Sequence, residues 1–211
     1  KITFSSEPVT EGLPNTVVFH YDVSSVTSQD IAIQQSWDER LRASVAKDQD
    51  TYTTTYFYPG YFRAKLLVDN QVIKEHDLYL PSSGWLTIAE SDPVPFYLPS
   101  DYSKGYLHVP SSLLREKQLL TRDEVPWINY YYLDDLGELP ANNFSLETSI
   151  KNDFNQGEAI CQTSQVNIIC SKGHFAIPLS IPGCVGKLTM SLGEQRISGA
   201  TYDLSGLGSH L

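Results

Sequence analysis

Positive charge is scarce in this sequence. Lys and Arg together number 15 against 25 Asp and Glu in 211 residues, and the formal net charge is −10 at pH 7. Binding to nucleic acid or to an anionic membrane surface depends on clustered Lys and Arg, and no basic cluster occurs here. Nor does the sequence contain the run of about 18 apolar residues that a transmembrane helix needs. We therefore expect no nucleic-acid partner and no membrane insertion by residues 1–211.

Catalytic signatures are also missing. No Ser lies in a Gly-x-Ser-x-Gly motif, and no glycine-rich phosphate loop precedes a predicted helix. The histidines are scattered without metal-ligand spacing, at His20, His76, His108, His174 and His210. These absences predict a protein that is not an enzyme and that has neither a cofactor nor a metal centre.

Cysteine is rare and confined to the last third of the chain, at Cys161, Cys170 and Cys184. The pattern Cys-x8-Cys-x13-Cys, with no Cys-x-x-Cys and no neighbouring His pair, is not a zinc spacing. Two arrangements remain open: one disulfide with one thiol left over, or three buried free thiols.

The residues that are plentiful indicate an all-β protein. Thirteen Tyr, twelve Pro and thirteen Gly, with a single Met, are typical of many short strands joined by turns. With 41% apolar residues the chain can bury a core. We expect two β domains, at residues 1–80 and 126–211, joined by an ordered connector at 81–125 with short strands and a short helix.

The first domain is organised around Pro59-Gly60. An aromatic run precedes this pair, and the following residues alternate between polar and apolar up to Val68, which predicts a strand on each side of a tight turn. Proline presets φ near −65° and glycine accepts the positive φ of a type II turn, so we expect a hairpin with positive φ at Gly60. Alternation over Ile31–Asp38 predicts another strand, with Trp37 as the large central side chain of the core.

Three sequence segments in residues 4–80 resemble the PKD domain family. They are Pro14-x2-Val17-x-Phe19-x-Tyr21-Asp22, Trp37-Asp38, and Tyr56-x2-Pro59-Gly60-Tyr61-Phe62-x2-Lys65-Leu66-x-Val68. The family usually carries Trp-x-Phe-Gly-Asp-Gly, whereas this chain continues from Trp37-Asp38 into Glu39-Arg40-Leu41 without glycine, so the segment is PKD-like. The resemblance implies an immunoglobulin-like β-sandwich of the kind found on extracellular and cell-surface proteins, usually without catalytic activity.

In the connector, Gly84–Ile88 and Val94–Leu98 are predicted as short strands. Ser111 or Ser112 is placed to cap a short helix that runs through Gln118. Its buried side would carry the leucines Leu113, Leu114 and Leu120.

The second domain is predicted from clean alternation over Phe144–Asn152, in which Phe144, Leu146, Thr148 and Ile150 face a core. Further strands are expected at Ala159–Gln162, Val166–Cys170, Phe175–Leu179 and Lys187–Leu192. The pattern Phe144-x-Leu146-Glu147-Thr148-x-Ile150-Lys151-Asn152 resembles the opening strand of laminin-G-like and concanavalin-A-like jelly rolls. Because residues 126–211 are few for such a fold, the resemblance implies an incomplete jelly-roll-like sandwich.

That second resemblance also brings an enzymatic alternative, because concanavalin-like folds include glycoside hydrolases. Those enzymes need two carboxylates about 5 Å apart or wider, commonly placed on one strand as Glu-x-Asp-x-x-Glu or Glu-x-Asp-x-Glu. Neither string occurs here, and Glu147 has no Asp or Glu two residues further on.

The densest cluster of aromatic and acidic residues lies at the start of the second domain. Its candidate ligand-binding residues are Trp127, Tyr130, Tyr132, Asp134 and Asp135. Aromatic faces beside carboxylates can stack on a sugar and hydrogen-bond its hydroxyls, and an acid pair can also hold Ca²⁺. In the competing interpretation, alternate tyrosines belong to the core and the acid pair is only part of a turn.

The combination of both domains resembles surface or periplasmic proteins of Bacteroidetes-type bacteria. It implies a non-enzymatic, extracytoplasmic binding or adhesion module whose ligand is a carbohydrate or a protein; the alternative is a glycan-acting enzyme or an accessory fragment of one. Since the sequence starts at Lys1 on a strand-like segment, we expect a processed or shortened form of a protein that is membrane-tethered in its native state.

Overall fold

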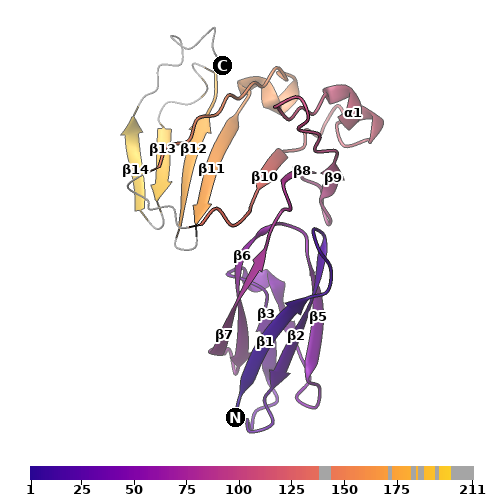
Figure 1. Cartoon of the computed structure of the whole chain (residues 1–211), viewed down its shortest axis with the longest axis vertical. Helices are drawn as coiled ribbons and strands as arrows, with labels where there is room; N and C mark the ends of the chain where they lie inside the picture. The colour runs from indigo at the N-terminus through magenta and orange to yellow at the C-terminus, as the bar shows by residue number, and fades with distance from the viewer. Residues whose placement is uncertain (138–143, 171–172, 182–183, 185–187, 193–194, 201–211) are drawn as a thin grey trace. The chain divides into compact units, whose positions relative to one another are not determined.

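A computed structural model describes residues 1–137, 144–170, 173–181, 184, 188–192 and 195–200 (Figure 1). The described chain is mostly antiparallel β-sheet, and one short α-helix, α1 (Ser111–Glu116), lies within these residues. Contacts divide the chain into two compact units, one made of residues 1–107 with 127–136 and the other of 108–126 with 137–211.

The first unit contains two sheets whose apolar faces share a core. One sheet has the strand order β1 (Thr3–Pro8), β2 (Asn15–Asp22), β5 (Thr51–Tyr56). The other has the order β4 (Arg42–Ser44), β3 (Ile31–Gln34), β6 (Gly60–Val68), β7 (Gln71–Leu80). Alternate residues of β2, β3, β6 and β7 enter the core, which includes Val17, Phe19, Tyr21, Ile31, Ile33, Leu66, Leu78 and Leu80.

A small third sheet belongs to the same unit, with the order β10 (Ile128–Tyr132), β8 (Trp85–Ala89), β9 (Phe96–Leu98). The strands predicted at Gly84–Ile88 and Val94–Leu98 thus overlap β8 and β9. The division into compact units differs from the predicted boundaries at residues 80 and 125. The physical reason is that β10 hydrogen-bonds to β8, so both strands belong to the first compact unit.

The prediction of a hairpin at Pro59-Gly60 is wrong. Strand β5 pairs with β2, whereas β6 pairs with β3 and β7, so Pro59-Gly60 passes from one sheet to the other. Gly60 is not among the glycines with positive φ; instead, a Cβ at this position would lie 2.9 Å from Cζ of Phe62. The tight hairpin lies between β6 and β7, where Asp69 and Asn70 have φ values of 50° and 62°, as a type I′ turn requires.

The prediction of a buried Trp37 is also wrong, because its side chain is 82% exposed. Strand β3 ends at Gln34, and the chain then bends into the 3₁₀ helix η1 (Glu39–Leu41), which the Asp38 side chain caps through the Arg40 N–H. The strand predicted over Ile31–Asp38 therefore stops before it reaches Trp37. Phe19 and Tyr21 occupy the core in its place.

In the second unit, helix α1 and the turn after it bury Leu114 and Leu120, as predicted, whereas Leu113 is only half-buried. The helix is shorter than expected, and its N-cap is Pro110 rather than a serine. The remaining strands form one antiparallel sheet in chain order: β11 (Ser164–Cys170), β12 (Gly173–Leu179), β13 (Leu188–Leu192) and β14 (Gln195–Ala200).

Two predicted strands of the second domain are wrong. Residues 144–152 form no strand, and Leu146, expected in the core, is 53% exposed. The stretch predicted as a strand at Ala159–Gln162 overlaps the 3₁₀ helix η2 (Gly157–Cys161). Period-2 alternation makes a strand only where a neighbouring strand supplies hydrogen bonds and a core covers one face, and the described strands of this unit pair only with one another.

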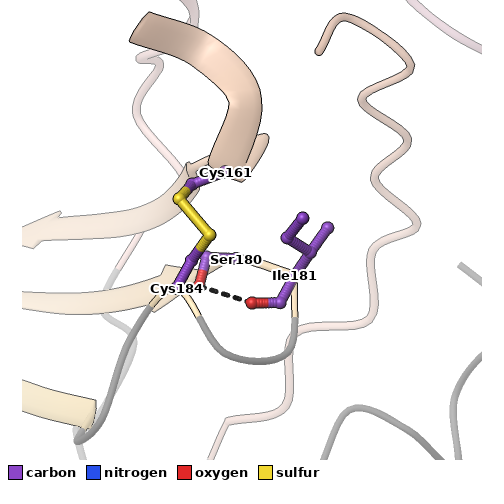
Figure 2. Close-up of a disulfide and its surroundings, with 4 residues drawn as sticks. All are labelled: Cys161, Ser180, Ile181 and Cys184. Carbon is purple, nitrogen blue, oxygen red and sulfur yellow. Dashed lines mark hydrogen bonds between the residues drawn. A yellow bond between two sulfur atoms is a disulfide. The ribbon is translucent and has the colours of Figure 1, made fainter.

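Of the two cysteine arrangements, the structure shows the disulfide, which joins Cys161 to Cys184 (Figure 2). Cys161 ends η2, and its carbonyl accepts a hydrogen bond from the N–H of Ile181 at 3.2 Å. The disulfide therefore ties η2 to the segment that follows β12.

Candidate ligand-binding site

The predicted site residues lie on and just beyond β10, where strand alternation separates the three consecutive tyrosines. Tyr132 pairs with Trp85 and Tyr130 with Thr87 across the β10–β8 ladder, whereas Tyr131 pairs with Leu86. Directly paired residues share one face of a sheet. Tyr130, Tyr132 and Trp85 therefore point to one face of the small sheet, and Tyr131 points to the other.

The Tyr131 face holds the small sheet against the segment before Pro59. The rings of Tyr131 and Tyr58 lie 6.3 Å apart between centroids, and the Tyr58 hydroxyl donates to the Glu90 carboxylate at 2.6 Å. Tyr97 of β9 donates its hydroxyl to the Phe57 carbonyl at 2.7 Å. Burial, reinforced by the Glu90 charge, raises the pKa of Tyr131 to about 12. These contacts occupy Tyr131 and fix the orientation of the sheet.

The other face carries uncovered aromatic rings. Tyr130 and Tyr132 are 42% and 46% exposed, so the alternative in which they belong to the core is wrong. The exposed Trp85 ring lies 5.2 Å from Tyr132 and 5.8 Å from Tyr102, at interplanar angles of 58° and 32°. We call the four residues Trp85, Tyr102, Tyr130 and Tyr132 the aromatic face.

Trp127 is 58% exposed but precedes β10, at the end of the strand opposite Tyr132. Its carbonyl accepts the N–H of Glu90 at 2.8 Å, which fixes its backbone beside the end of β8. Among the ring contacts of the described residues, none joins Trp127 to the aromatic face. The structure therefore brings together Tyr130 and Tyr132 but not Trp127.

Asp134 and Asp135 are exposed and follow a firmly held residue. Leu133 donates its N–H to the Ser82 hydroxyl at 2.8 Å, and its carbonyl accepts the Ser82 N–H at 3.0 Å. Burial raises the pKa of Tyr79, and the charges of Tyr61 and of the two aspartates add to that rise. The acid pair thus lies near a second set of stacked rings, Tyr61 and Tyr79, whose centroids are 4.6 Å apart.

The part of the chain that the structure describes contains no group of three His, Cys, Asp or Glu side chains placed to hold a metal ion. It also contains no helix long and apolar enough to cross a membrane. Chemically, the aromatic face offers flat apolar surface, and the acid pair that follows β10 in the chain offers hydrogen-bond acceptors.

Trp85 and Tyr102 were not predicted as site residues. A strand around Trp85 was expected, but its pairing with β10 was not. The only signal in the sequence was the position of Trp85 at one end of an alternating segment, which indicates neither the partner strand nor the face that stays uncovered.

No family model matches the chain, and neither the curated proteins nor the solved structures include one that is significantly similar to it.

Proposed function

We propose that this chain is a non-enzymatic, extracytoplasmic binding module whose aromatic face binds carbohydrate. The observation that carries the proposal is the exposed Trp85 ring at the small three-stranded sheet, which contacts the exposed rings of both Tyr102 and Tyr132. Soluble proteins seldom expose contiguous aromatic surface without a use for it.

A sugar ring suits this surface because it has one apolar C–H face and a rim of hydroxyls. The C–H face would stack on Trp85 or Tyr132, and hydroxyls at the rim would donate to a carboxylate such as Asp134, which lies two residues after Tyr132 in the chain. Tyr131 holds the sheet from behind, so the rings need little reordering when a ligand binds, which lowers the entropic cost of binding.

The first unit supports the proposal through its strand order. We propose that β1–β7 form an immunoglobulin-like sandwich, because sheets with the orders β1-β2-β5 and β4-β3-β6-β7 are what an A-B-E and C′-C-F-G arrangement requires. The second predicted sandwich is not part of the proposal, since the strand expected to open it does not form.

The disulfide supports the proposed location. Stable disulfides form in oxidising compartments such as the periplasm or the cell exterior, and Cys161–Cys184 is such a bond. The periplasm or cell surface is therefore the compartment we propose.

A glycan array, with a hydrolysis screen on the same sugars, tests the function. We expect retention of a subset of glycans without product release. Trp85→Ala and Tyr132→Ala should each abolish retention while the melting temperature stays within about 2 °C, since both side chains are partly exposed. Trp37→Ala is the matched control, because it removes an exposed indole elsewhere in the unit and should leave retention unchanged.

Other results would contradict the proposal. Release of reducing sugar would show a glycan-acting enzyme, and binding to protein but to no glycan would make the aromatic face a protein-docking surface. Equal loss of retention in Trp37→Ala and Trp85→Ala would mean that the aromatic face is not the site.

A further inference from the structure

A second candidate site is formed by residues of the second unit, none of which belongs to the aromatic face. It is a cleft of about 330 Å³ lined by Arg115, Thr121, Arg122, Val125, Phe154 and Gln156. That volume is at the lower end of the range for small-molecule sites. We call it the arginine cleft.

Local backbone structure places the two arginines. Arg115 lies in the last turn of α1, and the chain then reverses at Gln118, whose φ is 60°. Thr121 closes the next turn, because its hydroxyl oxygen accepts the N–H groups of Asp123 and Glu124 at 3.3 and 3.1 Å. Arg122 is therefore carried on a hydrogen-bonded turn.

Hydrogen-bond donors predominate in the arginine cleft. The Arg115 guanidinium donates to Oε1 of Gln156 at 3.1 Å, which occupies that acceptor and leaves further N–H groups on the same guanidinium. Arg122 forms no hydrogen bond or ion pair with the described residues. Both acceptor positions of the Thr121 hydroxyl are occupied by backbone N–H groups, so its own hydrogen remains to be donated.

The charges and the apolar surface around the arginine cleft further restrict the class of ligand that it can bind. No Asp or Glu lines the arginine cleft, although the chain has more acids than bases. Half-buried Val125 and Phe154 supply apolar surface beside the guanidinium groups. The segments that line the cleft also carry acidic residues directly adjacent in sequence to lining residues, which disfavours a polyanion: Glu116, Asp123, Glu124 and Glu158.

We propose that the arginine cleft binds a single carboxylate carried on an apolar group. A guanidinium presents parallel N–H groups that match the two oxygens of a carboxylate, and the apolar group would pack on Phe154. The same chemistry occurs in a free aromatic acid and in the C-terminal residue of a peptide. This proposal is independent of carbohydrate binding by the aromatic face.

Ligand-observed NMR on the whole chain tests the proposal, with benzoate and N-acetylphenylalanine as probes and the corresponding amides as neutral controls. We expect the acids to bind with Kd values on the order of 1 mM, since both guanidinium groups are exposed, and the amides at least about tenfold more weakly. Stronger binding of N-acetylphenylalanine than of benzoate would point to a peptide C-terminus as the source, and the reverse to a free acid.

Variants distinguish binding in the arginine cleft from a general effect of positive charge on the protein. Arg122→Gln should weaken acid binding about tenfold, and Arg122→Lys should restore only part of it because an ammonium lacks the planar fork. Lys117→Gln is the matched control: it removes a cation from the same segment that does not line the cleft, and should change binding less than about threefold. Equal binding of acid and amide, equal effects of Arg122→Gln and Lys117→Gln, or no binding of either acid at 10-fold the expected Kd, about 10 mM, would each overturn the proposal.

Discussion

Gly60 is the position at which a single added methyl group should reveal how the two sheets of the first unit are joined. An ideal Cβ there would lie 2.9 Å from Cζ and 3.0 Å from Cε2 of Phe62. Ordinary carbon contacts are about 3.5–4.0 Å. The Phe62 ring packs on Tyr56 with centroids 4.7 Å apart, so it has little room to withdraw.

The expected magnitude follows from two opposing effects. Overpacking of this kind costs about 1–3 kcal/mol, whereas replacing glycine by alanine at a compatible φ returns about 0.4–1 kcal/mol by restricting the unfolded chain. We therefore expect Gly60→Ala to lower the free energy of unfolding by a net amount of up to about 2.5 kcal/mol. Gly60→Asn should be no better than Gly60→Ala, because φ at Gly60 is not positive.

A double-mutant cycle measured by urea denaturation tests whether the clash with Phe62 causes the loss of stability in Gly60→Ala. In a Phe62→Leu background the shorter side chain removes the clash, so adding Gly60→Ala should there be neutral or stabilising, with a coupling energy of about 1–3 kcal/mol. Additive effects of the two substitutions, or a clearly more stable Gly60→Asn than Gly60→Ala, would refute the steric explanation and favour a backbone one.

Three further predictions rest on individual side chains. Trp37→Ala should change the free energy of unfolding by less than about 0.5 kcal/mol, whereas Phe19→Ala, which empties a fully buried position, should cost about 3–5 kcal/mol in the same denaturation assay. Replacing Cys161 and Cys184 together by Ser should destabilise the second unit by about 3 kcal/mol, the loop-entropy value for a separation of 23 residues; unchanged thermal unfolding of that unit would contradict it. The folded-state pKa of Tyr131, about 12, is raised above its ordinary value near 10, so the contribution of this tyrosine is fully present below about pH 10 and is lost as pH rises towards 12. Tyr131→Phe should reduce that alkaline loss of stability, and an identical pH profile for both proteins would show that Tyr131 does not titrate with folding.

Local alternation correctly indicates which side of β2 faces the core. In β2, Val17, Phe19 and Tyr21 are buried while His20 and Asp22 are exposed, as expected from a period of two. The same period of two separates Tyr131 from Tyr130 and Tyr132 in β10. These outcomes depend only on backbone geometry within a few residues, which the sequence displays directly.

Strand pairing decided which alternating segments form strands and which strands become neighbours. The same period occurs in residues 144–152, which form no strand, and it continues in the sequence as far as Trp37, which lies beyond the end of β3. The aromatic face required Trp85 and Tyr132 to become cross-strand neighbours although they are far apart in sequence. The sequence by itself thus determined a β-rich chain and the facing of individual side chains. Only the tertiary structure decided which strands meet and which rings stay uncovered, because long-range hydrogen bonding and burial are set by the partner strand and not by the segment itself.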